Sequence, residues 1–318
     1  MLSSKIKYQL DFAKKSKIFY ITIVANEVDY KKNISNLKQF LKSTKEDKIS
    51  LVNYHECFSR IERLNEVIEI IKQSDKEILI SAATSTPLDN LYEPLVNIFF
   101  WRNARTRYDI SWKSDEIDFY LFDKKWYESD FEKQTKGILS VRKETDFRNK
   151  LFSFIDESKF DGIFRYAKWT GARQDETSEY LTNKNKFPTF IELIKEYQKS
   201  YCSFVIESEL SEWMNPFTEK TMIPFLTKTL PIVLGGQNYI KELKDMGFYV
   251  FNDEFGFESA DELPTFDLNK AIYYHKCIEN YNKMSVQEIS ELYNKNIDKI
   301  EHNYNLISSI LFDKKTIL

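Results

Sequence analysis

A Thr-Glu-Lys triplet at positions 218–220 carries side chains that could hold a phosphorylated ligand at the start of a helix. Thr218 stands where an N-cap residue belongs, and Glu219 falls in the first turn, where the helix dipole favours a carboxylate. Lys220 is unusual there, because an exposed cation in the first turn opposes the dipole by roughly a few tenths of a kcal/mol. A bound phosphate would reverse that sign. The triplet therefore indicates either a phosphate site or a capped helix without a ligand.

Two adjacent glycines, Gly235 and Gly236, end the apolar run LPIVL at 230–234. Glycine permits a sharp turn from a strand into a helix and leaves backbone amides available to a ligand. The chain contains neither G-x-x-x-x-G-K-[ST] nor G-x-G-x-x-G, the usual phosphate and dinucleotide motifs. Turn geometry alone would also explain the pair, so both interpretations stay open.

These residues lie in the second of two halves that each alternate apolar runs with amphipathic segments. Strands are expected at 18–24, 49–54, 78–82, 117–122, 162–169, 202–206, 230–234 and 248–251. Helical spacing marks 34–41, 61–71, 91–101, 190–197, 218–227, 239–246 and 271–310. Such alternation predicts an α/β protein whose mostly parallel sheets are covered by helices on both faces.

We expect two Rossmann-like domains followed by a helical tail. The first, residues 1–155, would face the acceptor, and the second, residues 156–285, would hold the donor. Residues 286–318 would form a helix that packs back across both domains. A crevice at the carboxyl ends of parallel strands suits a nucleotide-linked ligand, although fold alone does not fix function.

The composition describes a folded protein whose surface charge is mixed. Its 318 residues are 42% hydrophobic, which is enough for two domains of roughly 150 residues. A net charge of −3 does not favour nucleic-acid binding through overall charge. No apolar run reaches the roughly 18 residues that span a bilayer, and the N-terminal MLSSKIKYQLDFAKKSK lacks the apolar core of a secretory signal. We therefore expect a cytoplasmic protein without a transmembrane segment. Abundant Lys, Asn and Ile associate it with a low-GC bacterium or its virus.

Three segments together resemble the donor-binding signature of the α1,3-fucosyltransferases, whose pattern is roughly F-E-N-S, Y-V-T-E-K and V-P-V-V-L-G. They are CSFVIESE at 202–209, NPFTEK at 215–220 and TLPIVLGG at 229–236. The chain is also similar to fucosyltransferase-like enzymes of phages and other viruses. In those, T-E-K-T precedes a buried strand, a glycine and K-x-L-x-x-x-G-F, which here is 241–248, and IEHNYNL at 300–306 is similar to their C-terminal helix.

The resemblance covers about residues 160–310 and implies a GT-B glycosyltransferase. That fold has two facing Rossmann-like domains and transfers sugar from a nucleotide sugar without a metal or other cofactor, with inversion at the anomeric carbon. The donor-binding residues that the resemblance implies are Arg173, Glu207, Thr218, Glu219, Lys220, Gly235 and Gly236.

Individual roles also follow from the resemblance. Glu219 would meet the donor ribose, Lys220 the diphosphate, and Arg173, ahead of Tyr180-Leu181, the phosphates. Fixed cations suit a departing nucleoside diphosphate, which develops negative charge. Arg173 could equally be a surface arginine. Ser208 and Pro216 replace the family's asparagine and tyrosine, so the sugar and base are not specified.

The sequence favours metal-free chemistry but does not single out a base. The expected strand at 117–122 leads into Asp123-Lys124-Lys125 rather than Asp-x-Asp, and no His, Cys or carboxylate cluster has ligand spacing. An inverting enzyme needs a base near the acceptor hydroxyl. Asp109 and Glu27 are the candidates, with His55 as a further one. Solvated carboxylates and a structural histidine are the alternatives.

A basic and aromatic segment, FFWRNARTRYD at 99–109, bears on the acceptor. Trp101, Arg102 and Arg105 could contact a sugar or a phosphate backbone. The same arginines could instead neutralise the last carbonyls of a helix. The acceptor is therefore expected to be a glycan or lipid-linked saccharide, with hydroxymethylated DNA bases as the alternative. A non-catalytic binding protein of the same fold, or an unrelated nucleotide-binding α/β enzyme, are rival hypotheses.

Overall fold

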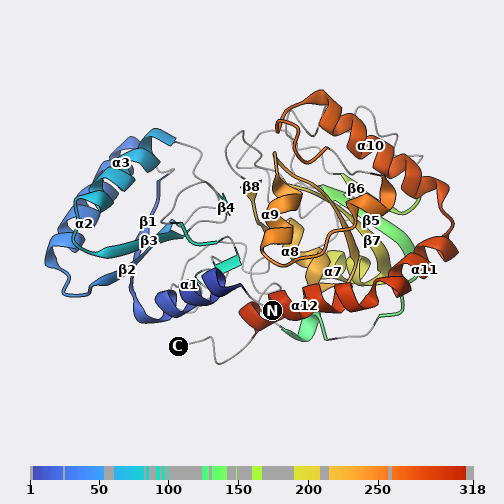
Figure 1. The fold of residues 1–318 in the computed structure, drawn as a ribbon, viewed down its shortest axis with the longest axis horizontal. Coiled ribbons are helices and arrows are strands. Elements are labelled where there is room, and N and C mark those ends of the chain that lie inside the picture. Colours follow the sequence, from blue (N-terminus) through green and yellow to red (C-terminus); the bar gives the residue numbers. More distant parts are fainter. Residues whose placement is uncertain are drawn as a thin grey trace, which may run out of the picture. The chain divides into compact units, whose positions relative to one another are not determined.

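The computed structural model describes residues 3–23, 26–53, 61–81, 84–85, 91–93, 95–96, 100, 124–128, 131–141, 148, 160–166, 190–207, 215–256 and 260–312. The chain divides into two compact units, each with parallel strands and helices (Figure 1). The first unit comprises Met1–Ile110, Trp213–Thr218 and Ser309–Leu318, and the second comprises Ser111–Glu212 and Glu219–Ser308. The predicted α/β class is confirmed.

Three parallel strands form the main sheet of the first unit, in the order β1-β2-β3. Their bounds are Lys17–Ile21, Lys48–Asn53 and Glu77–Ser81, and the helices of this unit are α1 (Ser4–Lys15), α2 (Glu27–Ser43) and α3 (Ile61–Lys72). The strands and helices predicted for 18–82 are confirmed apart from their ends. Helix α1 was not predicted, although Ser3 caps it by accepting a hydrogen bond from the Ile6 amide.

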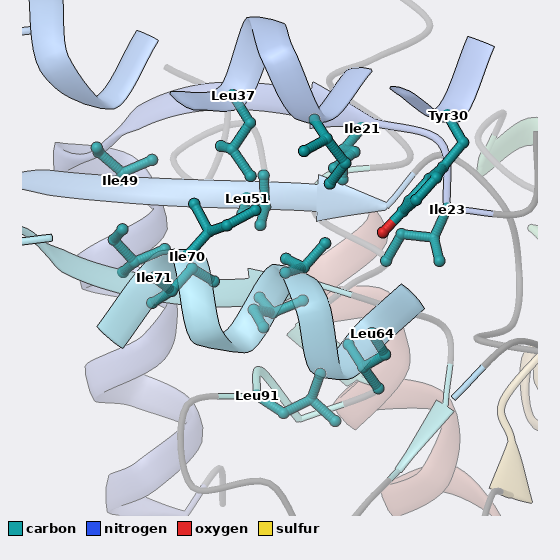
Figure 2. Close-up of a cluster of buried hydrophobic side chains, with 14 residues drawn as sticks. Ile21, Ile23, Tyr30, Leu37, Ile49, Leu51, Leu64, Ile70, Ile71 and Leu91 are labelled. Atoms are coloured by element: carbon teal, nitrogen blue, oxygen red, sulfur yellow. The ribbon is translucent and has the colours of Figure 1, made fainter. Parts of the chain in front are cut away.

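Branched apolar side chains form the core of the first unit (Figure 2). They come from strand positions and from one face of α2 and of α3, as the period of each element requires. Those labelled in Figure 2 are Ile21, Ile23, Tyr30, Leu37, Ile49, Leu51, Leu64, Ile70, Ile71 and Leu91. Full burial of one such side chain contributes roughly 1.5–3 kcal/mol. Apolar periodicity in the sequence thus accounts for this layer.

A short antiparallel pair also belongs to the first unit. Strand β4 (Thr84–Ser85) pairs with β8 (Asn215–Pro216), so residues from much later in the chain contribute to this unit. The helix expected from residue 91 begins later, because Leu91 forms a parallel bridge with Ile80, and helix is seen at 95–96 and 100.

Four parallel strands form the sheet of the second unit, in the order β6-β5-β7-β9. These strands are β5 (Thr135–Val141), β6 (Ile163–Tyr166), β7 (Ser200–Ile206) and β9 (Leu230–Leu234). The helices of this unit are α7 (Phe190–Lys199), α8 (Glu219–Leu226), α9 (Tyr239–Asp245), α10 (Leu268–Lys283), α11 (Val286–Lys295) and α12 (Ile297–Leu311), the last of which runs into the first unit. Helix α8 packs against β7 and β9, and α11 against β5 and β7.

The second sheet differs from expectation in two places. Strand β5, which was not predicted, pairs with both β6 and β7, so residues 135–141 belong to this sheet although they precede position 155. The strand expected at 248–251 does not form. There the Asn303 side chain accepts from the Tyr249 amide at 2.8 Å and donates to its carbonyl at 2.7 Å, so both backbone groups of Tyr249 are satisfied by a side chain.

Three further expectations concern the helical tail, the strand at 117–122 and membrane-spanning segments. Helices α10 to α12 confirm the helical tail predicted from residue 271. The strand expected at 117–122 lies outside the described residues. Among the helices that are described, none combines the length and apolarity needed to cross a membrane.

Candidate functional site

The candidate site lies at the carboxyl edge of the second sheet. The last residues of β7 and β9, Ile206 and Leu234, are paired in register. Glu207 and Gly235 come directly after them and therefore share this edge. Open parallel sheets bind ligands at that edge, where strand ends meet helix N-termini. Glu207 is fully buried, which is unusual for a carboxylate and requires hydrogen-bond partners.

Helix α8 brings Glu219 and Lys220 into its first turn. It begins at Glu219, directly after the buried Thr218. Lys220 Nζ lies 2.6 Å from Glu219 Oε1, and the two side chains are 20% and 21% exposed, respectively. The adjacent carboxylate thus offsets the unfavourable position of a cation in the first turn. Neighbouring residues on a helix rarely face each other, so the pairing reflects a local geometry that collects both charges at the helix start.

A buried hydroxyl group connects α8 to the strand end. Thr221, the next residue in the first turn, donates from Oγ1 to Glu207 Oε1 at 2.6 Å. The same Oγ1 is 2.9 Å from the Tyr239 hydroxyl. All three residues are buried, and desolvation raises the pKa of Tyr239 well above its ordinary value, so its hydroxyl stays protonated. The ends of β7, α8 and α9 are therefore joined by polar contacts.

Gly235 is needed because the ring of Tyr239 packs directly against it. A Cβ built on Gly235 would lie 1.9 Å from Tyr239 Cδ1. Any larger residue would have to displace a fully buried ring. The sharp turn from strand to helix at this glycine is thus accompanied by a close contact with the first residue of α9.

The amides that follow Gly236 are occupied by the chain itself. Asn238 N donates to the Asp261 carbonyl at 2.8 Å, and Ile240 N and Lys241 N donate to the Asp261 carboxylate at 2.9 Å each. Gln237 N donates to Thr265 Oγ1 at 3.1 Å. The expectation that backbone amides of this turn are available to a ligand is therefore wrong for these four residues. Asp261 neutralises the start of α9, and burial raises its pKa despite those hydrogen bonds.

Two buried cations near the site were not predicted. Lys270 of α10 donates from Nζ to the carbonyls of Gly236, Asp261 and Leu263 at 2.8, 3.1 and 3.1 Å. Arg148, also fully buried, donates to the Ile206 carbonyl at the end of β7. A signal existed for Lys270, because it falls on the buried stripe of α10 with Ala271, Tyr274 and Cys277. The surrounding residues RKETDFRNK give no such signal for Arg148.

Glu27, a candidate base, starts α2 in the first unit and is paired with cations. Its Oε2 lies 2.8 Å from Arg63 Nη2 and its Oε1 lies 3.4 Å from Lys31 Nζ. The hydrogen bond from Arg63, followed by that from Lys31, lowers the pKa of Glu27. A lowered pKa makes a carboxylate a weaker proton acceptor near neutral pH. Arg63 is itself held by the Ile23 carbonyl at 2.9 Å and by the Tyr30 ring at 4.2 Å.

Several predicted residues lie outside the described part of the chain. They are the candidate base Asp109, the donor residue Arg173, the acceptor residues Trp101, Arg102 and Arg105, and also His55, Asp123 and Ser208. Their roles stay predictions. Of the remaining predicted residues, the structure brings Glu207, Thr218, Glu219, Lys220, Gly235 and Gly236 to strand ends and helix starts around β7 and β9.

Metal ligands and thiols add little to this site. In the described ranges no group of three or more His, Cys, Asp or Glu side chains could hold a metal ion. Cys202 and Cys277 are free and buried, and burial raises the pKa of both thiols.

Comparison with known proteins identifies no family for this chain. No protein-family model matches it, and no curated protein matches it in sequence. Functional inference therefore depends on the residues and their geometry.

Proposed function

We propose that this protein is a metal-independent glycosyltransferase of the GT-B type, which transfers a sugar from a nucleotide sugar to a saccharide hydroxyl with inversion. The observation that carries the proposal is the Glu219–Lys220 pair at the start of α8, which is partly exposed and joined through Thr221 to the end of β7. The Thr-Glu-Lys motif is also the most specific part of the resemblance to fucosyltransferases.

Helix α8 offers the chemistry that a nucleoside diphosphate requires. A diphosphate next to the first turn would meet the Lys220 ammonium and the positive end of the helix dipole. It would replace Glu219 as the partner of Lys220, and the released carboxylate could accept hydrogen bonds from ribose hydroxyls. On ligand binding, the ion pair between Glu219 and Lys220 would thus be exchanged for one contact with the diphosphate and one with the ribose.

The proposed reaction is a single displacement. The acceptor hydroxyl attacks the anomeric carbon, a base takes its proton, and the bond to the nucleoside diphosphate breaks with the electron pair going to the leaving oxygen. Lys220 would stabilise that negative charge. Asp109 is the preferred base, because the cation pairing that lowers the pKa of Glu27 makes Glu27 less suitable.

Binding of nucleotides tests the proposal. Unfolding temperatures would be measured with UDP, GDP, CMP and dTDP and with their sugar conjugates. At 100-fold excess over Kd a ligand stabilises the protein by roughly 2.7 kcal/mol, which corresponds to about 5–10 °C for domains of this size. If none of these nucleotides raises the unfolding temperature, the proposal is wrong.

Lys220→Ala tests the site, and Lys72→Ala is its matched control. Lys72 pairs with Glu69 at 2.8 Å on an exposed face of α3, so its loss removes a lysine–glutamate ion pair of similar length, though more exposed, from the other unit. Hydrolysis of the nucleotide sugar in the absence of acceptor would be measured beside the thermal shift. Lys220→Ala should abolish both the nucleotide-dependent shift and this hydrolysis, whereas Lys72→Ala should preserve both. Binding without hydrolysis or transfer would instead indicate a non-catalytic protein of this fold.

A further inference from the structure

Three fully buried side chains form a continuous hydrogen-bonded chain behind the first turn of α8. Glu207 follows β7, Thr221 belongs to α8, and Tyr239 begins α9. The distances are 2.6 Å between Thr221 Oγ1 and Glu207 Oε1 and 2.9 Å between Thr221 Oγ1 and the Tyr239 hydroxyl. Three elements separated in sequence are thereby connected through one threonine hydroxyl.

The direction of donation along this chain follows from the inventory of hydrogens. A threonine hydroxyl has one hydrogen, and Thr221 uses it on Glu207. Tyr239 must therefore donate to Thr221, and the chain ends on a carboxylate acceptor. Thr221 is thus fixed from both sides.

Tyr239 is held in place by packing as well. Its ring occupies the space that a Cβ on Gly235 would take, at 1.9 Å from Cδ1 and 2.3 Å from Cγ. The hydroxyl end of Tyr239 therefore cannot shift far from Thr221 without a movement of the β9 end. The hydrogen bonds among Glu207, Thr221 and Tyr239 therefore fix the start of α8 relative to the ends of β7 and β9.

We propose that Thr221 and Tyr239 are positioning residues of the donor site, which hold the first turn of α8 so that Glu219 and Lys220 face the nucleotide. The inference rests on the proposed function. Neither residue needs to touch the ligand. Its physical basis is that Thr221 directly follows Lys220 in the chain, so fixing its side chain fixes the turn that presents both charges.

Two variants separate positioning from general stabilisation. Thr221→Val keeps the shape but removes the hydroxyl, whereas Thr221→Ser keeps the hydroxyl. The matched control is Thr227→Val, because Thr227 is also buried, lies just after α8, and donates only to backbone carbonyls, with Ile223 O at 2.7 Å. Both valine variants should lower the unfolding temperature, because each loses a buried hydrogen bond.

Donor affinity distinguishes these variants. It would be measured with the nucleotide that shifts the wild-type unfolding temperature most. Thr221→Val should weaken it by about tenfold, the scale set by a buried hydrogen-bonding group left without its partner. The KM for donor hydrolysis should rise likewise. Tyr239→Phe should show a smaller loss, and Thr221→Ser and Thr227→Val should stay within about threefold of wild type. Equal affinities for Thr221→Val and Thr227→Val would overturn the inference.

Amide hydrogen exchange without ligand keeps the two proposals distinguishable. If wild type binds no nucleotide, the glycosyltransferase proposal fails on its own. The positioning role then predicts faster exchange in α8 for Thr221→Val than for wild type, with α11 unchanged as an internal reference. Unaltered exchange in α8 would overturn the inference even when the nucleotide experiment is negative.

Discussion

The carboxyl edges of the two parallel sheets carry charged side chains in opposite arrangements. In the first unit, Glu27 is exposed and its charge is matched by the buried Arg63. In the second unit, Glu207 is buried and bonded by a hydroxyl, whereas Glu219 and Lys220 remain partly exposed at a helix start. The same topology therefore presents an exposed carboxylate paired with a buried arginine in one unit, and a half-buried ion pair beside a buried, hydrogen-bonded carboxyl group in the other. This supports placing the ligand site by side chains rather than by fold.

The largest expected effect tests how far the second edge depends on its buried cation. Lys270→Met would leave three backbone carbonyls, those of Gly236, Asp261 and Leu263, without their charged donor, which should cost about 3 kcal/mol or more. The unfolding temperature should fall by roughly 6–12 °C. Lys276→Met, on an exposed position of the same helix, is the control and should change little. Similar unfolding temperatures for the two variants would show that Lys270 does not hold the Gly236 turn.

Sequence reasoning succeeded where one segment contains the whole signal. The run LPIVL at 230–234 predicted β9 correctly, because a strand buried on both faces is continuously apolar. Strand β5 was missed because its apolar core, Ile138 and Leu139, is short and is bordered by Gly137 and Ser140. The apolar stretch at 248–251 does not form the predicted strand. The Asn303 side chain bonds both backbone groups of Tyr249, and Phe251 N donates to the Pro231 carbonyl of β9.

The site shows the same limit over longer distances. Residue types alone indicated the Thr-Glu-Lys segment as a possible phosphate site. They could not reveal that Thr221 meets Glu207 or that Lys270 meets the Gly236 carbonyl, because those partners are brought together only by sheet register and helix packing. The prediction that the amides after Gly236 are available to a ligand was wrong for the same reason. Asp261, which occupies two of them, comes from a distant segment.

A second prediction concerns the close contact that fixes Tyr239. Gly235→Ala should destabilise the protein by roughly 1–3 kcal/mol, because the new methyl group collides with a buried ring. It should also weaken nucleotide binding by displacing Tyr239 from Thr221. Gly247→Ala is the control, since its Cβ would be 3.5 Å from Leu306 and the cost there comes from its φ of +98° alone. Chemical denaturation of both variants, with and without nucleotide, measures the difference. Retained nucleotide affinity in Gly235→Ala would contradict the role of this contact.

A third prediction concerns Lys133, which lies at the amino ends of the strands of the second sheet, opposite the edge that carries the candidate site. Lys133 donates to the Thr227 carbonyl at 3.2 Å and lies 5.4 Å from the centre of the Tyr293 ring, with Lys228 nearby. Burial lowers the pKa of Lys133 from 10.5 to about 7. The unfolded chain therefore binds more protons between these two values, and the free energy of unfolding should rise with pH across that interval, by at most roughly 1.4 kcal/mol per pH unit.

Lys133→Met isolates this titration. Its free energy of unfolding should depend less on pH than that of wild type between about pH 7 and pH 9. Urea denaturation at several pH values would measure the difference. Nucleotide affinity should be unaffected, because Lys133 lies before β5 at the amino ends of the strands, whereas the candidate site lies at their carboxyl ends. Parallel pH profiles for the two proteins would show that Lys133 titrates normally.

The smallest expected effect concerns the first edge. Glu27→Gln removes a carboxylate whose pKa is lowered by Arg63 and Lys31 and whose side chain is 62% exposed. The stabilisation from this pairing is present above the ordinary pKa of the carboxyl and is lost as pH falls through the lowered value, so at neutral pH the variant should be slightly less stable.

Sugar transfer by Glu27→Gln should stay close to wild type, whereas Asp109→Asn should lower it by about 10²–10⁴-fold, the usual contribution of a general base. A large loss in Glu27→Gln with normal donor affinity would reverse the assignment and make the first edge the catalytic one. Arg63 would then act by orienting the base, because its guanidinium is already fixed by the Ile23 carbonyl and the Tyr30 ring.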